Sequence, residues 1–262
     1  MNSIVCIKQV PNTNEVRINQ ETGTLIRDGV PSIINPDDKN AIEGALKIKE
    51  ELGGTVTVIT MGPEQAKAAL REAMAMGADR AILLSDRAFA GSDTWATATI
   101  LAAALEKIGE RDLIFCGRQA IDGDTAQVGP ELAEFLDIPQ VTYAKEVSVE
   151  KDKVRVTRYG ESGDYIMEAP MPVMLTTIRE LNEPRLPHVR DIIGAWEKKE
   201  IEVWTMEDLT IDPTQIGLKG SPTNVFRSFV PVREKQSEII QGNTPREKAA
   251  LLLDRLSSQK LV

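Results

Sequence analysis

The sequence predicts an α/β protein in which helices flank a mostly parallel sheet. Short apolar runs, each the length of a buried strand, alternate with amphipathic segments from the N-terminus to Pro139. The 262 residues and a hydrophobic fraction of 42% suffice to fill the core of one large domain. After Pro139 the apolar alternation becomes polar on one face, which indicates an antiparallel meander attached to the sheet.

The elements follow one another in a regular order. The buried strands are predicted at 3–7, 56–60, 81–84, 113–116 and 173–177, and the meander strands at 147–149, 154–158 and 165–168. A small hairpin is predicted at 16–18 and 24–26. The helices are predicted from Asn35–Asp38 to before Gly53, at 64–76 with Pro63 at the first position, at 94–108, up to about Leu136, and at 245–256.

The last part of the chain has a different character. Residues 205–262 contain four prolines, the loosely apolar stretch 225–230 and one convincing terminal helix. A tail with exposed aromatic side chains and no core of its own usually packs on something else. We favour a second subunit over the chain's own surface, and divide the chain into an α/β domain at 1–204 and a C-terminal arm at 205–262.

Composition excludes several classes of protein. A net charge of -9 argues against broad nucleic-acid binding, which needs a basic surface. No run approaches the roughly 20 apolar residues of a membrane-spanning helix, and the N-terminus lacks the pattern of a secretory signal, so a cytoplasmic location is expected. Cys6 and Cys116 lie in separate strand-like runs, which favours reduced core thiols over a disulfide or a metal pair.

The most informative motif is Gly117–Pro130, which directly follows a predicted strand. Such a junction is where α/β proteins bind nucleotides. Asp124 and Gln127 have a simpler interpretation as helix-capping residues. Capping leaves Arg118 and Thr125 unexplained, whereas a phosphate would pair with Arg118 and accept hydrogen bonds from Thr125 and the helix amides. We therefore favour nucleotide binding.

Two further junctions, Asn35–Asp38 and Met61–Pro63, are predicted to open at the same edge of the sheet. The first is equally well explained as a helix start with acids on the helix dipole, and the second as an ordinary turn. Neither a dinucleotide fingerprint nor a P-loop occurs. The only histidine, His188, lies in a loop-like segment without a nucleophile, and no metal-ligand spacing is visible. We infer a nucleotide-binding protein in which a bound cofactor, and not a side chain, supplies any reactive group.

Five segments, in order, resemble the β subunits of electron-transfer flavoproteins. They match the family's opening strand, its second element, its A-M-G-A-D-R segment, its G-[KR]-Q-A-I-D signature and its N-E-P-R segment, and they lie at 5–11, 35–38, 74–80, 117–127 and 181–185. Ser162 departs from the family pattern, in the meander rather than in the nucleotide turn. From the first strand to about Val203 the chain is identified as a member of this family.

The resemblance implies an adenine-nucleotide α-hydrolase-like fold and a heterodimer in which the arm packs on the α subunit. In respiratory members the β subunit holds a structural AMP, and the FAD of the α subunit shuttles electrons. In bifurcating members of anaerobes, FAD takes the AMP pocket and its flavin receives hydride from NADH. Electrons then divide between an acyl-CoA dehydrogenase-like partner, reached through the α-subunit FAD, and a low-potential acceptor such as ferredoxin or flavodoxin.

The branch of the family decides the cofactor. Gly123 and the residues 125–130 resemble the bifurcating, anaerobic group more than the mitochondrial one. The working hypothesis is therefore a subunit that binds FAD and NAD(H), with AMP in place of FAD as the alternative.

The resemblance also assigns site residues by motif position. Backbone groups at Cys6 and Met61 would meet adenine or ribose, Asp38 or Asp122 would meet hydroxyl groups, and the helix start at 125–128 would meet phosphate. The assigned cofactor-binding residues are Cys6, Asn35, Pro36, Asp37, Asp38, Met61, Gly62, Gly117, Arg118, Gln119, Ala120, Ile121, Asp122, Gly123, Asp124, Thr125, Ala126, Gln127 and Val128. Gly62 and Pro63 are assigned to a second nucleotide such as NAD.

Partner binding is assigned to the segment after the N-E-P-R motif. Leu186, Val189, Ile192 and Ile193 fall in the family's recognition loop, which docks the acyl-CoA dehydrogenase-like flavoenzyme. Burial of these side chains within the heterodimer is the alternative.

Two functions from other classes remain open at this point. A stand-alone, ATP-binding sensor of the universal-stress type shares the helix-flanked parallel sheet, but it has no use for an arm with Phe226 and Phe229. An enzyme that transfers hydride to its own substrate would need an acid–base constellation, which the sequence lacks.

Overall fold

The computed structural model describes residues 1–12, 31–226 and 237–262, and the chain divides into two compact units, Met1–Phe226 and Arg227–Val262. The hairpin predicted at 16–18 and 24–26 lies outside the described residues. Residues 205–226, which the sequence groups with the arm, belong to the first unit. The function of the remaining arm stays a prediction.

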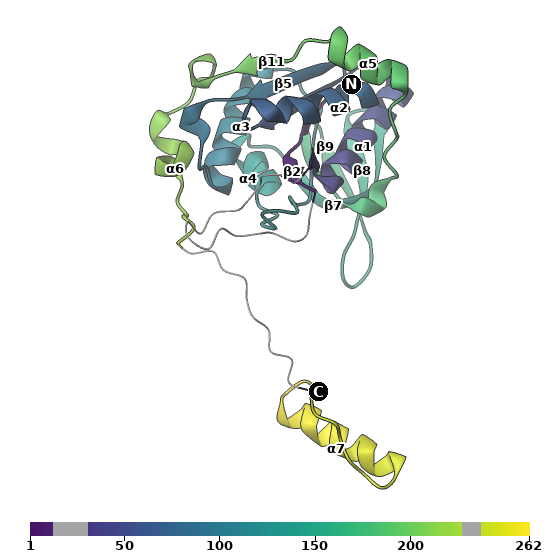
Figure 1. Ribbon diagram of the computed structural model, residues 1–262. Coiled ribbons are helices and arrows are strands. Elements are labelled where there is room, and N and C mark those ends of the chain that lie inside the picture. Colours follow the sequence, from purple (N-terminus) through teal and green to yellow (C-terminus); the bar gives the residue numbers. More distant parts are fainter. Residues whose placement is uncertain (13–30, 227–236) are drawn as a thin grey trace. The chain divides into compact units, whose positions relative to one another are not determined.

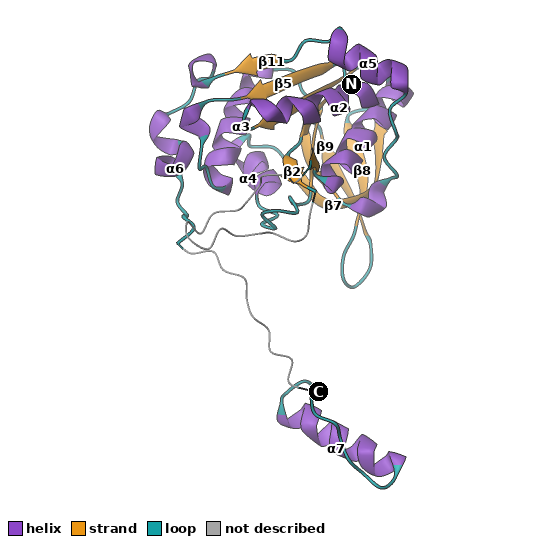
Figure 2. Ribbon diagram, viewed as in Figure 1, coloured by secondary structure: helices purple, strands orange, loops and turns teal. Residues whose placement is uncertain are grey.

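The first unit is built on one large sheet (Figures 1 and 2). Among the described residues it has nine strands, in the order β11-β5-β4-β1-β6-β10-β7-β8-β9. The strands are β1 (Asn2–Cys6), β4 (Thr55–Met61), β5 (Arg80–Leu84), β6 (Leu113–Gly117), β7 (Gln140–Glu150), β8 (Lys153–Arg158), β9 (Tyr165–Pro170), β10 (Val173–Thr177) and β11 (Glu202–Trp204). Neighbours are parallel from β11 to β7, while β7, β8 and β9 are antiparallel, which confirms the predicted fold class.

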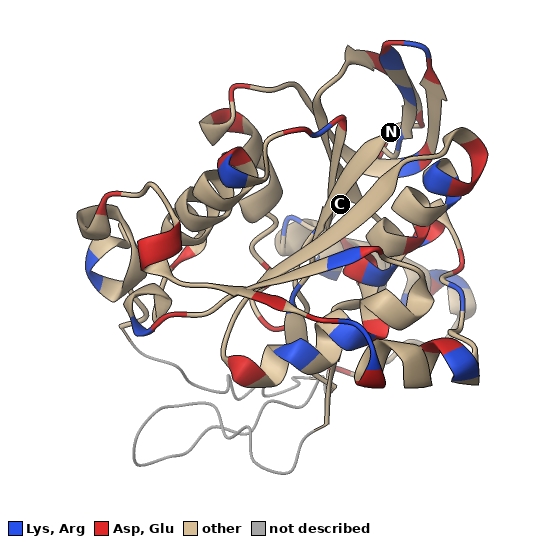
Figure 3. Ribbon diagram, turned by 90° about the horizontal axis from the view of Figure 1, so that it is seen from above, with Lys and Arg blue, Asp and Glu red and all other residues tan. Residues whose placement is uncertain are grey.

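Helices cover both faces of this sheet, because the central strands are apolar on both sides. Alternate residues of β1 enter opposite cores: Val5 packs with α1 and α2, and Ile4 packs with α3 and α4. The helices of the first unit are α1 (Pro36–Leu52), α2 (Lys67–Met76), α3 (Thr94–Ile108), α4 (Val128–Phe135), α5 (Val189–Glu197) and the short α6 (Gly217–Gly220). Charged residues lie mainly on helices, loops and the meander, and the central strands are almost free of them (Figure 3).

Several boundaries differ from the prediction for local reasons. Glu64–Ala66 form a 3₁₀ turn, so α2 begins at Lys67, and Pro63 precedes the turn in an extended conformation. The prediction of a loop around His188 misses α5, which begins at the next residue. Likewise, β11 was not expected, because a strand of three residues leaves little pattern in a sequence. A separate antiparallel pair, β2 (Gln9–Pro11) and β3 (Ser32–Ile34), was also not predicted.

The described part of the second unit contains α7 (Pro245–Ser258), close to the predicted terminal helix. Its N-terminus is stabilised by a reciprocal pair: Thr244 Oγ1 accepts a hydrogen bond from Glu247 N–H, and Glu247 Oε2 accepts one from Asn243 N–H. None of the described helices combines the length and the apolar character needed to cross a membrane.

Candidate functional site

A cavity of about 340 Å³ opens at the carboxyl ends of β1, β4 and β6. This is the edge at which parallel sheets bind ligands. The first turns of α3 and α4 form its walls, and the segment between β6 and α4 partly encloses it. Residues from widely separated parts of the sequence thus meet at one place.

Asp38, in the first turn of α1, joins the ends of two strands beside this cavity. Its Oδ2 accepts a hydrogen bond from Lys8 N–H at 2.7 Å, and its Oδ1 accepts one from Gly117 N–H at 2.8 Å. Asn35 Nδ2 donates to the same Oδ1 at 3.1 Å. Burial raises the pKa of Asp38 to about 7, although these three hydrogen bonds oppose the rise. Both oxygens are therefore engaged within the protein, and Asp38 shapes the cavity by joining its walls.

Asn35 precedes α1, but its side chain does not cap the helix. Asn35 Nδ2 donates to the carbonyl oxygen of Gln119 at 2.9 Å, and its Oδ1 accepts from Ile121 N–H at 3.1 Å. The side chain thereby holds the segment between β6 and α4. The approach is close enough to require Gly117, because a Cβ there would lie 2.3 Å from Asp38 Oδ1.

The segment between β6 and α4 has an unusual backbone. Asp124 and Ala126 have φ values of 53° and 54°, in the left-handed region that residues with a Cβ seldom occupy. A helix cannot continue through that conformation, so α4 begins at Val128 with Gln127 at its N-cap, and the alternative interpretation of Asp124 as the cap does not apply. Gln127 stands at the N-cap position, and its side chain makes no capping hydrogen bond. The carboxylate of Asp124 instead accepts a hydrogen bond from Gln119 Nε2 at 2.6 Å.

The start of α4 provides hydrogen-bond donors. First-turn amides of a helix have no acceptor within the helix, and the residues Val128 and Gly129 line the cavity. A Cβ at Gly129 would lie 2.6 Å from Thr176 Cγ2 and 2.9 Å from Cys116 Sγ, so glycine lets this helix end approach the sheet closely.

Arg118 places a positive charge in the cavity wall. Its Nε is buried and has no hydrogen-bond partner among the described residues, although Asp37 Oδ2 lies 3.8 Å away. The guanidinium group lies over the ring of Tyr143, with 5.9 Å between Cζ and the ring centroid. Burial raises the pKa of Asp37, and the charge of Arg118 opposes that rise. A buried donor without an acceptor is costly, so an anionic ligand would stabilise this position.

The wall formed by α3 was not predicted from the sequence. Ser92, Asp93, Thr94, Thr97 and Leu101 line the cavity. Asp93 is the N-cap of α3, and its Oδ1 accepts a hydrogen bond from Ala96 N–H at 3.0 Å. The available signal is the polar S-D-T run at 92–94, which stands at the start of the helix predicted at 94–108 and from the sequence alone indicates only a helix start.

The floor of the cavity contains two thiols. Cys6 and Cys116 lie opposite each other in the register of β1 and β6, and both are free and buried, which confirms their predicted place in the core. Burial raises the pKa of Cys6 to about 12 and that of Cys116 well above its ordinary value. Both side chains are therefore neutral at physiological pH.

Comparison with known proteins places the chain in a family. A family model described as "Electron transfer flavoprotein domain" matches residues 22–209. The electron transfer flavoprotein subunit beta of Thermoanaerobacterium thermosaccharolyticum is 58% identical over 262 residues, which cover 100% of both chains. The chain belongs to the electron-transfer flavoprotein β-subunit family.

Two further relatives of this flavoprotein chain are named after larger complexes. The caffeyl-CoA reductase-Etf complex subunit CarD of Acetobacterium woodii is 51% identical, and the acryloyl-CoA reductase electron transfer subunit gamma of Anaerotignum propionicum is 46% identical. Each alignment covers 100% of both chains. Family membership confirms the resemblance and sets aside the universal-stress sensor.

The flavoprotein chain brings most of the assigned cofactor-binding residues to the cavity. Those that line it are Cys6, Asp38, Met61, Gly117, Arg118, Gln119, Ala120, Gly123, Thr125, Ala126, Gln127 and Val128. Those outside its lining are Asn35, Pro36, Asp37, Gly62, Ile121, Asp122 and Asp124. Besides the α3 wall, the lining residues that sequence reasoning missed are Ile7, Lys8, Cys116 and Gly129.

Gly62 and Asp122 border a neighbouring cavity of about 330 Å³, and Gly62 also borders one of about 680 Å³. Met61 is shared by all three cavities. The carboxylate of Asp122 pairs with Lys8 Nζ at 2.7 Å. The three cavities therefore lie side by side along the sheet edge.

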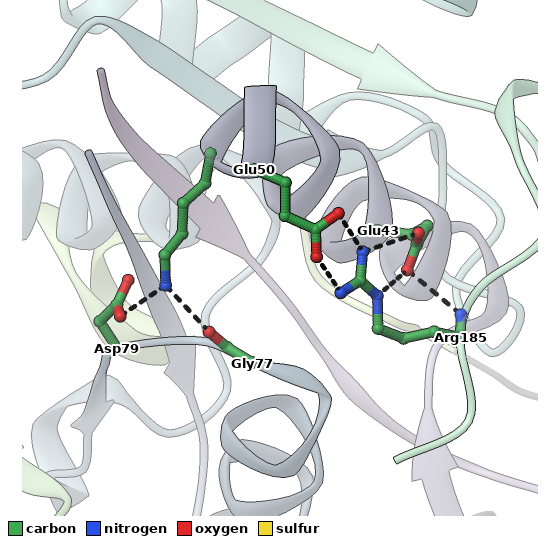
Figure 4. Close-up of polar contacts among 6 residues, drawn as sticks. Glu43, Glu50, Gly77, Asp79 and Arg185 are labelled. Atoms are coloured by element: carbon green, nitrogen blue, oxygen red, sulfur yellow. Dashed lines mark hydrogen bonds and ion pairs between the residues drawn. The ribbon is translucent and has the colours of Figure 1, made fainter. Parts of the chain in front are cut away.

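The assigned docking residues lie on the outer surface around α5. Leu186 is 90% exposed and Val189 is 73% exposed, while Ile192 and Ile193 are less so. Arg185, which directly precedes Leu186 in the sequence, is bound by two glutamates of α1. Its Nε donates to Glu43 Oε2 at 2.8 Å, and its guanidinium group also pairs with Glu50 (Figure 4). Arg185 thus anchors to α1 the start of the segment that carries these four residues.

Proposed function

We propose that this chain is the β subunit of a heterodimeric, bifurcating electron-transfer flavoprotein. It binds FAD in the cavity beside Arg118 and accepts electrons from NADH. The electrons pass through the FAD of the α subunit to an acyl-CoA dehydrogenase-like flavoenzyme, and to a low-potential acceptor such as ferredoxin or flavodoxin.

The observation that carries the proposal is the group of donors around the cavity. Arg118 Nε is buried without an acceptor among the described residues, and the first-turn residues of α4 face the same space. These groups suit a phosphate, Arg118 by charge and the amides by hydrogen bonding. A volume of about 340 Å³ suits the adenosine part of a nucleotide.

Two observations favour FAD over AMP. Gly123 lines the cavity, its φ is not positive, and a Cβ there would meet no atom within 4 Å. Local packing therefore does not require glycine at this position, and its small size leaves space for a ligand. In addition, the neighbouring cavities continue past Met61, which accommodates a molecule longer than AMP or a second nucleotide near Gly62.

When bound, the FAD would supply the hydride and single-electron chemistry. The protein's own residues hold and orient it. Arg118 and the α4 amides would fix the phosphates, and the neutral thiols of Cys6 and Cys116 keep negative charge away from the floor. Lys8, which lines both this cavity and its neighbour, compensates the charge of Asp122 in the neighbouring cavity.

The names of two relatives support the proposal that this chain works with an acyl-CoA dehydrogenase-like flavoenzyme. Relatives named after caffeyl-CoA reductase and acryloyl-CoA reductase align over their full length. An acyl-CoA dehydrogenase-like flavoenzyme is therefore the proposed electron acceptor, and the exposed Leu186 and Val189 are the proposed anchors for it. The arm from Arg227 onward is proposed to pack on the α subunit.

Cofactor content of the purified heterodimer tests the proposal. We expect denatured extracts to contain two FAD per heterodimer, whereas one FAD and one AMP would refute the bifurcating assignment in favour of a structural AMP. Arg118→Gln is expected to lose the β-site nucleotide while the α-site FAD remains. The matched control is Arg158→Gln, since Arg158 also lies over the Tyr143 ring but does not line the cavity.

A further inference from the structure

The last segment of the first unit is bonded directly to the wall of the candidate nucleotide cavity. Residues 217–223, which we call the latch segment, lie just before the second unit begins at Arg227. Their partners are Ser92 and Asp93, at the start of α3. Both partners line the cavity.

Four hydrogen bonds make this connection. Gly217 N–H donates to Ser92 Oγ at 3.0 Å, and Asp93 N–H donates to Ser221 Oγ at 2.8 Å. The N–H and Oγ1 of Thr223 both donate to Asp93 Oδ2, each at 2.8 Å. The fit is specific, because Gly217 has a φ of 64° and a Cβ there would lie 2.2 Å from the carbonyl oxygen of Ala88.

The two carboxylate oxygens of Asp93 accept hydrogen bonds from different segments. Oδ2 holds Thr223, while Oδ1 accepts the hydrogen bond from Ala96 N–H that starts α3. Burial acts to raise the pKa of Asp93, but the hydrogen bonds from Ala96, Thr223 and Ser221 together hold it below its usual value. The carboxylate is thus ionised, and its negative charge stands beside a cavity suited to phosphate.

The same wall is also fixed from the other side. Thr94 Oγ1 donates to Glu131 Oε1 in the first turn of α4 at 3.1 Å. The starts of α3 and α4, and the latch segment, therefore form one hydrogen-bonded unit around the cavity.

We propose that Asp93 is a positioning residue that couples nucleotide binding to the base of the C-terminal arm. This inference rests on the proposed nucleotide site. The donors of Thr223 hold Asp93 Oδ2 on the latch segment and partly neutralise it. Loss of the Oγ1 donor leaves Asp93 Oδ2 with the Thr223 N–H alone, so the less neutralised carboxylate repels the phosphates more strongly. Conversely, bound nucleotide fixes the α3 wall and thereby stabilises the latch segment, because binding coupling is reciprocal.

The test compares two substitutions in the heterodimer of full-length chains, freed of β-site nucleotide. Thr223→Val removes the Oγ1 donor and retains the shape of the side chain. Thr214→Val is the matched control, because Thr214 N–H and Oγ1 also both donate to an aspartate oxygen, Asp212 Oδ1, away from the cavity. AMP is the probe, and its Kd is measured by calorimetry.

We expect Thr223→Val to bind AMP about 5-fold more weakly than wild type, the lower end of usual coupling effects. Thr223→Ser should restore the affinity, and Thr214→Val should not change it. An unchanged Kd in Thr223→Val overturns the coupling while leaving the nucleotide site in place. If the wild-type heterodimer binds neither AMP nor FAD at this site, both the proposed function and the coupling are overturned.

A second readout separates coupling from simple loss of structure. Saturating AMP should slow hydrogen exchange at the amides of Gly217 and Thr223 in wild type, and this protection should be lost at Thr223 in Thr223→Val. Exchange in the latch segment that does not respond to AMP in wild type refutes the proposal.

Discussion

Gly117→Ala tests the closest contact in the cavity wall. A Cβ at this position would lie 2.3 Å from Asp38 Oδ1 and 2.8 Å from the backbone nitrogen of Asp38. Real Cβ atoms do not approach so closely, and the helix backbone cannot turn aside as a flexible side chain would. The start of α1 must therefore move away from β6.

The cost follows from this displacement. Overpacking of a well-packed site costs about 1–3 kcal/mol. For a chain of this size about 2 kcal/mol corresponds to a fall in Tm of roughly 4–8 °C. The movement also lengthens the hydrogen bond from Gly117 N–H to Asp38 Oδ1, now 2.8 Å, so nucleotide binding should weaken as well.

Gly123→Ala is the matched control in the same segment. It also lines the cavity, but its added Cβ meets nothing within 4 Å and its φ is not positive. We expect its Tm to stay within about 2 °C of wild type, with a small gain from the less flexible unfolded chain. Thermal unfolding followed by circular dichroism measures both variants. Equal Tm values for Gly117→Ala and Gly123→Ala would show that α1 does not approach β6 as described.

Three further predictions concern Asp38, the thiols and Arg185. Asp38→Asn puts an amide donor against Lys8 N–H or Gly117 N–H, so the free energy of unfolding measured in urea should fall by about 1–3 kcal/mol. An unchanged free energy of unfolding would contradict the assigned role of Asp38. Cys6 and Cys116 should resist iodoacetamide in the folded protein. Because burial raises the pKa of Cys6 to about 12, the labelling of this thiol should stay slow between pH 7 and pH 9. Rapid labelling of either thiol, detected by mass spectrometry, would refute their burial. Arg185→Gln leaves the buried Glu43 carboxylate without its charged partner, so the free energy of unfolding should fall by about 3 kcal/mol. The KM of the dehydrogenase partner for the heterodimer should rise. Arg190→Gln is the control, because the ion pair of Arg190 with Asp191 is exposed, and it should not lower stability.

The strands and most helices were predictable, since their apolar runs report directly which residues must be buried. The central strands β1, β4 and β6 were each predicted to within two residues of their observed ends. The start of α4 was not, because two residues with a Cβ adopt left-handed backbone there, and no local sequence signal marks that choice. The helix at 94–108 was predicted, but its place in the cavity wall was missed for another reason. Its distance from the cavity depends on the strand order β5-β4-β1-β6, which the sequence does not state.

The role of Asp38 shows what motif matching leaves open. The sequence placed it at the cavity and assigned it to ligand hydroxyl groups. Its two oxygens accept hydrogen bonds from Lys8, Gly117 and Asn35, and the structure therefore supports a connecting role. Only distances between segments far apart in the chain distinguish these two roles.

The charges around the cavity explain how an acidic chain offers an anion site. Asp122 and Asp124, the acidic residues between β6 and α4, would repel a phosphate if their charges faced it, but each of them has a partner in the structure. Asp122 pairs with Lys8, Asp124 accepts from Gln119, and Asp38 accepts from amides of two strand ends. With these carboxylates engaged, the donors available to an anion among the described lining residues include Arg118 Nε, which is buried without a hydrogen-bond partner, and the first-turn amides of α4. The overall charge of -9 therefore does not decide the local potential, which depends on which acids are already paired.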